Sequence, residues 1–164
     1  MKCDKGPKML VCSVFAIFVV STALSAHARQ CSVANVAGTY GFTASGTLIL
    51  PVGPVPLGAA GTVALHRDGT VSGKEFRSVG GQFATETIGP GSWSVDSDCT
   101  GKLTAEVFVG TVLNRTSVLR FVVDDDLSEI RVVQESLTFA DGSTPPAILT
   151  FEGRRIFNNQ GNQQ

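Results

Sequence analysis

The chain has 164 residues, with 13 basic and 14 acidic side chains and a formal net charge of −1. A chain of this length suits one domain with a single hydrophobic core. Because lysine and arginine are few and scattered, the sequence offers no basic surface for phosphate groups, and we exclude nucleic acid and anionic membranes as partners.

The first 28 residues have the three parts of a secretory signal peptide. Three lysines precede an apolar stretch over 9–23, and the small-x-small motif Ala26-His27-Ala28 follows it. The apolar stretch is shorter than the roughly 20 residues that span a bilayer. We therefore predict cleavage after Ala28, no integral membrane anchor in the mature protein, and a secreted or periplasmic location.

Two of the four cysteines, Cys31 and Cys99, lie beyond the predicted signal peptide. An even pair of cysteines in an exported protein predicts a disulfide. At this separation a disulfide stabilises the fold by about 4 kcal/mol in the chain-entropy description. The alternative is a two-cysteine metal site, but no histidine stands in a suitable place, and we predict no metal and no cofactor.

From Gly38 onward, segments with β-strand composition alternate with turns rich in Gly, Pro, Asp and Ser, and no helical period is present. Residues 38–50 form the clearest strand, with Tyr40 and Phe42 on the apolar face and threonines on the other. Three prolines follow. Because proline has no amide donor for a ladder, residues 51–57 are expected to form a loop or an edge crossing.

Further strands follow, separated by turn residues. We predict them at 59–66, 70–79, 82–88, 91–95, 102–110, 117–123, 129–139 and 148–157. Short strands in sequential hairpins predict an all-β fold, a single antiparallel up-and-down β-barrel of about eight strands, with a β-sandwich as the alternative. The barrel domain then covers 29–157, and the Asn, Gln and Gly tail over 158–164 is predicted to be disordered.

Three motifs resemble those of a known family: Gly-Thr-Tyr-Gly-Phe at 38–42, the hairpin at 68–73, and Gly-Ser-Trp-Ser-Val at 91–95 leading to Asp-Cys-Thr-Gly at 98–101. From about Gly38 to Phe157 the chain resembles exported bacterial proteins of the allene oxide cyclase barrel-like group, within the calycin type of small β-barrel. The resemblance implies an antiparallel barrel of about eight strands. Most members have no known activity, and no segment matches the functional residues of the plant enzymes that cyclise a fatty-acid epoxide.

Motifs for hydrolytic or metal chemistry are weak. The one histidine after the signal peptide, His66, adjoins the turn at 67–69, and we interpret it as a solvated turn residue. Oxygen ligands for calcium could be supplied by Asp124, Asp126 and Glu129, or by Asp96 and Asp98. Aspartate is, however, common in hairpin turns because its side chain bonds the nearby backbone. A carboxylate pair of the glycosidase type remains open among five strand glutamates, Glu75, Glu86, Glu106, Glu135 and Glu152.

One set of charged residues has a strand parity that could place it inside the barrel. Glu75 and Arg77 stand between two valines of the same parity, and so does Arg120 in a later strand. A buried charge needs a partner, so inward-facing side chains would form ion pairs. These three residues, with Tyr40 and Phe42, are the candidate ligand-binding residues of the lumen. Such ion pairs would either brace the barrel or orient the polar head of an apolar ligand.

Three functions are compatible with this sequence. The first is a monomeric binding protein that holds one small apolar ligand in the barrel. The second is an isomerase or cyclase acting on a lipid-like substrate, which needs a polar group in an open cavity. The third is a non-catalytic structural or surface-interaction domain with a filled barrel.

Overall fold

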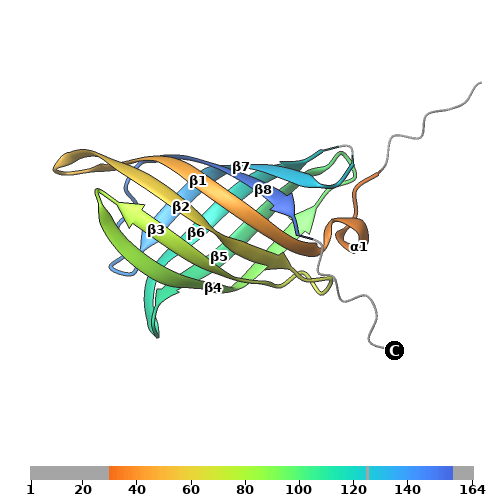
Figure 1. Cartoon of the computed structure of the whole chain (residues 1–164), viewed down its shortest axis with the longest axis horizontal. Coiled ribbons are helices and arrows are strands. Elements are labelled where there is room, and N and C mark those ends of the chain that lie inside the picture. Colours follow the sequence, from red (N-terminus) through yellow and green to blue (C-terminus); the bar gives the residue numbers. More distant parts are fainter. Residues whose placement is uncertain (1–29, 125, 157–164) are drawn as a thin grey trace, which may run out of the picture.

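The computed structural model describes residues 30–124 and 126–156, and in this part of the chain the protein is a closed antiparallel barrel (Figure 1). Each strand pairs with its neighbour in sequence, and the last strand pairs with the first. The strands are β1 (Gly38–Leu50), β2 (Gly53–Leu65), β3 (Val71–Val79), β4 (Gln82–Val95), β5 (Thr100–Val109), β6 (Val112–Val123), β7 (Glu129–Phe139) and β8 (Ala147–Arg155). The predicted eight-strand barrel is confirmed, and the sandwich alternative is excluded.

The predicted signal peptide at 1–28 and the tail at 158–164 lie outside the described residues. Within the described part, no helix has the length and apolar character needed to cross a membrane.

Residues 51–52 form a turn, but 53–57 belong to a strand, which corrects the expectation of a loop or an edge crossing over 51–57. β2 begins at Gly53 and runs through Pro54 and Pro56, both paired with β1. The neighbouring β3 pairs with β2 only from Leu57 onward. The two prolines therefore stand where β2 has one free edge, and their missing amide donors interrupt no β2–β3 ladder.

Three register shifts interrupt the ladders, each with one extra residue in one strand. They lie at Gly89-Pro90 in β4, at Asn114 in β6 and at Glu135 in β7. The first explains why 82–88 and 91–95 were predicted as two strands: they are the two halves of β4, joined through a cis peptide bond at Pro90. Each extra residue changes which parity of the strand faces the lumen.

A short helix, α1 (Val33–Val36), covers one end of the barrel (Figure 1). Val36 is fully buried against the main core cluster. The disulfide between Cys31 and Cys99 ties the segment before α1 to the turn between β4 and β5, which confirms the predicted pairing. A disulfide of this kind indicates an oxidising environment.

Apolar side chains fill both ends of the lumen. The larger cluster lies at the α1 end and includes Trp93 and Phe121, whose ring centroids are 6.5 Å apart. The smaller cluster lies toward the opposite end and consists of Leu48, Leu57, Leu137 and Leu149, with other apolar side chains packed on it. The space between the two clusters is the site described next.

Candidate functional site: the lumen cavity and its ion-pair cluster

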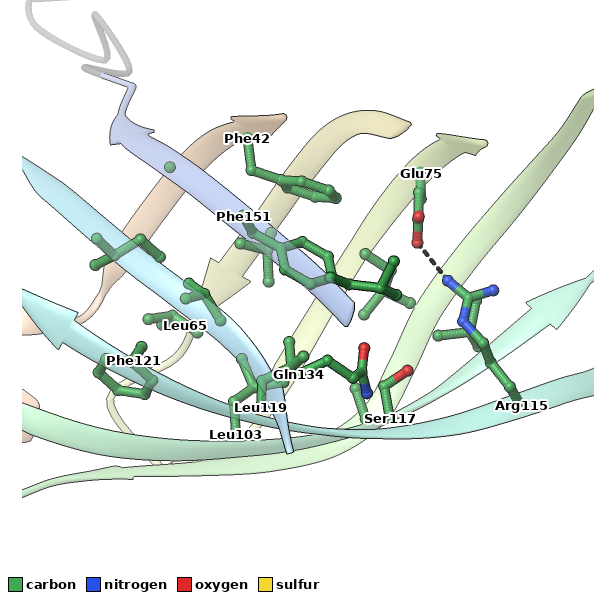
Figure 2. A pocket seen from close by; sticks show the side chains of 18 of the residues that line it. Phe42, Leu65, Glu75, Leu103, Arg115, Ser117, Leu119, Phe121, Gln134 and Phe151 are labelled. Carbon is green, nitrogen blue, oxygen red and sulfur yellow. Dashed lines mark hydrogen bonds and ion pairs between the residues drawn. The ribbon is translucent and has the colours of Figure 1, made fainter. Parts of the chain in front are cut away.

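The lumen contains a cavity of about 70 Å³ lined almost entirely by apolar side chains. Figure 2 shows the rings of Phe42 and Phe151 in its middle, Phe121 toward one end and the Glu75–Arg115 ion pair at the other. The centroids of the two central rings are 6.2 Å apart. The cavity is thus an apolar space with one charged end.

The charged end is a cluster of two arginines and two glutamates. Arg115 donates from Nη1 to Oε2 of Glu86 at 2.6 Å and from Nη2 to Oε2 of Glu75 at 2.7 Å. Arg77 donates from Nη2 to Oε1 of Glu86 at 2.5 Å. At most 11% of any of these side chains is exposed. Two positive and two negative charges balance, which is the arrangement a buried cluster requires.

Both arginines also reach the side chain of Asn114. Its Oδ1 accepts from Nη2 of Arg77 at 3.3 Å and from Nη1 of Arg115 at 3.4 Å. Asn114 is the extra residue of the β5–β6 register shift, since Val107 pairs with Arg115 while Phe108 pairs with Leu113. Arg115 shares the strand parity of the inward Ser117 and Leu119, and the bulge places the Asn114 amide beside the same cluster.

Burial raises the pKa of the Glu75 carboxyl above its usual value, and the nearby charge of Glu86 acts in the same direction. The guanidinium groups of Arg115 and Arg77 oppose this shift without cancelling it. The Glu75 carboxyl accordingly takes up a proton more readily on acidification than an ordinary glutamate does.

Two neutral polar side chains, Ser117 and Gln134, also line the cavity. The Gln134 amide donates from Nε2 to the backbone oxygens of Val118 and Ser136. These bonds orient the amide, and Figure 2 shows its oxygen directed toward the cavity interior. Gln134 and Ser117 are groups that could bond a polar atom of a bound molecule.

The five residues predicted to line the lumen have four different locations. Phe42 and Glu75 line the cavity, and Arg77 lies behind Glu75 in the ion-pair cluster. Tyr40 faces inward but holds α1, with its hydroxyl donating to the Val36 oxygen at 2.7 Å. Arg120 is on the outer surface, so its predicted place in the lumen is wrong.

Arg120 faces outward because 117–123 is apolar at both strand parities, and the inner face is taken by Leu119 and Phe121. Its side chain is 56% exposed and pairs with Glu135, which also meets Lys102. Among Glu75, Glu106, Arg120 and Glu135, which an isomerase could use as polar groups, Glu75 alone lines the cavity.

Sequence reasoning missed the central residue of the cluster, Arg115. It stands in Asn114-Arg115-Thr116, which fits an N-glycosylation pattern, and its strand parity is opposite to that of Arg120, which the prediction took as the inner one. Glu86 was a candidate only as one of five strand glutamates. Charge balance could have indicated Arg115, because glutamates that face inward on β3 and β4 require arginine or lysine partners that also face inward.

The polar turns at the α1 end have structural roles. Asp68 and Asp98 each accept from the backbone amide two residues later, at 2.9 and 3.0 Å. His66 bonds Ser72 through Nε2 at 2.8 Å, and its backbone oxygen accepts from the Trp93 indole at 2.9 Å. Among the described residues no group of three or more His, Cys, Asp or Glu side chains could hold a metal ion.

Comparisons with known proteins show the fold and nothing finer. No family model matches the chain, and no curated protein matches it. Solved structures that are similar to it include two β-barrels. A redesigned β-barrel, mFAP1, bound to DFHBI shares 16% identity over 76% of this chain and 98% of its own, with a TM-score of 0.47. The structure of EF1p2_mFAP2b bound to DFHBI shares 12% identity over 76% and 97%, with a TM-score of 0.51.

Proposed function

We propose that this protein is an exported binding protein that holds one small, mainly apolar molecule in the barrel lumen. The observation that carries the proposal is the cavity itself, an apolar space whose polar groups gather at one end. Ligand sites in proteins commonly combine an apolar lining with a few convergent polar groups that orient the ligand. The structure of EF1p2_mFAP2b, which has the same barrel fold, contains the small molecule DFHBI.

The cavity limits the size of the ligand. Its volume of about 70 Å³ is below the roughly 300 Å³ at which sites for drug-sized molecules begin. The ligand is therefore a short aliphatic or single-ring compound, or its entry moves the rings of Phe42 and Phe151. Both rings are only partly buried although they lie inside the barrel.

The polar end of the cavity favours a ligand with a hydrogen-bonding group and no net charge. The guanidinium of Arg115 is already engaged by two carboxylates. An anionic ligand would have to displace Glu75 or bring a third negative charge into the cluster, at the cost of burying it unpaired. The Ser117 hydroxyl and the Gln134 amide oxygen can bond a neutral alcohol or amide without that cost.

The proposal includes export from the cell and membership of a barrel family. The basic, apolar and small-x-small segments of residues 1–28 support a cleaved signal peptide, and the disulfide is consistent with this. The motifs at 38–42 and 91–101 support a place in the allene oxide cyclase barrel-like group. A cyclase or isomerase reaction would need Glu75 free to exchange a proton with substrate, whereas Arg115 holds it.

The test adds 1-hexanol or hexanoate, which have the same alkyl chain and differ in charge, to the protein. NMR chemical shifts of the methyl groups of Leu119 and Val132, which line the cavity, report binding. We expect saturable shifts with hexanol and weaker ones with hexanoate. Ser117→Leu, which fills the cavity, removes the shifts, and Phe151→Leu, which enlarges it, strengthens binding. Unmoved methyl signals in both the natural protein and Phe151→Leu would refute ligand binding.

The small cavity volume also favours a second candidate, a barrel filled by its own side chains that serves as a structural or surface-interaction domain. In that case neither compound shifts the lumen methyl signals, and Ser117→Leu lowers the free energy of unfolding because a filled lumen has no room for the larger side chain. The same two variants therefore separate the two functions.

A further inference from the structure

The end of the barrel opposite α1 is built from four hairpin turns, which we call the hairpin end (Figure 1). It comprises residues 46–58, 78–84, 108–114 and 138–148, the tips of the β1–β2, β3–β4, β5–β6 and β7–β8 hairpins. All four connect neighbouring strands of the same barrel, so their tips form a ring around one mouth.

Large apolar side chains are exposed on every one of these hairpins. Val52 is 88% exposed at the β1–β2 tip and Val112 is 70% exposed at the β5–β6 tip. Phe83 stands exposed beside the β3–β4 turn and Ile148 at the start of β8. Phe76 stacks on Phe83, and Ile49 and Val109 add to the same ring. Soluble proteins rarely gather exposed apolar side chains in this way unless they bind something.

The hairpin end is also almost free of charge. Its four segments contain one charged residue, Asp141, and no lysine or arginine. The described turns at the α1 end, by contrast, carry Arg67, Asp68, Asp96, Asp98, Asp124 and Asp126. The turns at the α1 end are thus charged, whereas the turns at the hairpin end carry exposed apolar side chains.

We propose that the hairpin end docks on the surface of an uncharged lipid bilayer, inserting its apolar tips among the headgroups. A surface without lysine or arginine has no attraction for anionic lipid, so its partner is neutral. The four tips are separate projections, not one flat face, and a fluid interface can close around each of them. Apolar area placed at the headgroup boundary supplies the binding free energy.

Docking at this end would also present the mouth of the lumen to a medium that dissolves apolar molecules. The inference nevertheless stands on residues that do not line the cavity. Vesicle binding and hexanol binding can therefore succeed or fail independently.

The experiment is flotation with vesicles of phosphatidylcholine, using protein with an N-terminus verified by intact mass. The double variant Val52→Asp with Val112→Asp is compared with Val122→Asp and Val133→Asp together, in the same N-terminal form. The control valines are 52% and 51% exposed and lie on β6 and β7 away from the hairpin end. Both doubles change the net charge equally, and melting temperatures establish that each variant is folded.

We expect the hairpin-end double variant to lose binding by about tenfold or more, since each aspartate replaces an inserted aliphatic group. The control double should bind like the natural protein, and binding should be insensitive to salt. Equal loss in both doubles, absence of binding to neutral vesicles, or binding that needs anionic lipid would overturn the proposal. So would a dimer in solution that the hairpin-end variant dissociates, because a second copy would then cover this surface.

Discussion

Arg115 on β6 and Glu75 on β3 form an ion pair of 2.7 Å across the inside of the barrel, although two strands separate them around its wall. The second carboxylate bound by Arg115 belongs to β4, so one guanidinium connects three strands. Such a connection spans the lumen where backbone pairing cannot, and it defines the polar end of the cavity.

Removing Arg115 should be strongly destabilising. Arg115→Met leaves the Glu75 carboxylate buried without a hydrogen-bond donor, and the expected loss in the free energy of unfolding is about 3–5 kcal/mol. Adding Glu75→Gln should recover part of it, because one uncompensated charge is gone. Urea denaturation measures both variants. Arg120→Met removes an exposed pair and should cost under about 1 kcal/mol; a cost equal to that of Arg115→Met would contradict this account.

Glu75 should make stability depend on pH. Its pKa in the folded protein is raised above the ordinary value of 4.5, mainly by burial. The folded state therefore binds the Glu75 proton more tightly than the unfolded chain does. The resulting contribution to the free energy of unfolding is fully present below pH 4.5 and is lost as pH rises through the raised pKa. Surface aspartates such as Asp68 and Asp98 have lowered pKa values and act in the opposite direction.

The measurement is the difference in unfolding free energy between the natural protein and Glu75→Gln at a series of pH values. Subtraction removes the shared surface carboxylates. The natural protein should lose stability relative to the variant as pH rises above 4.5. A difference that stays constant, or that changes with the opposite sign, would show that Glu75 has no raised pKa.

The disulfide should stabilise the barrel substantially. Cys31 and Cys99 are 68 residues apart, and closing a loop of that length contributes about 4 kcal/mol in the chain-entropy description. Cys31→Ser should lower the melting temperature markedly while leaving the β-sheet circular dichroism spectrum in place. An unchanged melting temperature in the oxidised protein would refute a stabilising role for the bond.

The Tyr40 hydroxyl should hold α1 on the barrel. It donates to the Val36 oxygen at 2.7 Å and accepts from Nη2 of Arg155 at 2.8 Å. Tyr40→Phe removes both bonds and should cost about 1–2 kcal/mol, because the buried partners lose a donor and an acceptor. Hydrogen exchange should accelerate at 33–37 and stay unchanged in β5; equal acceleration in β5 would instead indicate general loosening.

Much of the fold follows from local sequence. The alternation of apolar and polar residues in 38–50 specifies a strand with one buried face, and Tyr40 and Phe42 lie on the inner side as that pattern predicts. Turn residues separate the strands, and the Asp68 and Asp98 side chains bond the backbone as expected of turn aspartates. These features depend only on neighbours in the chain, so they can be read from it.

The composition of the lumen could not be predicted in the same way, because it depends on register. The extra residue at Glu135 shifts the inner face of β7 from one parity to the other, so that Gln134 lies inside and Glu135 lies outside with Arg120. Arg115 lies inside because it shares its parity with Leu119 and Phe121, the inner residues of β6. A segment such as 117–123 has apolar residues at both parities, so its sequence does not indicate which face points into the barrel.

The sequence by itself determined an all-β chain of hairpins with one disulfide and placed Glu75 and Arg77 on a common strand face. Only the tertiary structure decided that Arg115 joins them, because an ion pair across a barrel depends on closure of the sheet and on the positions of its bulges. It also decided that the four hairpins with almost no charge gather at one end, since antiparallel pairing brings alternate turns of the chain to the same mouth.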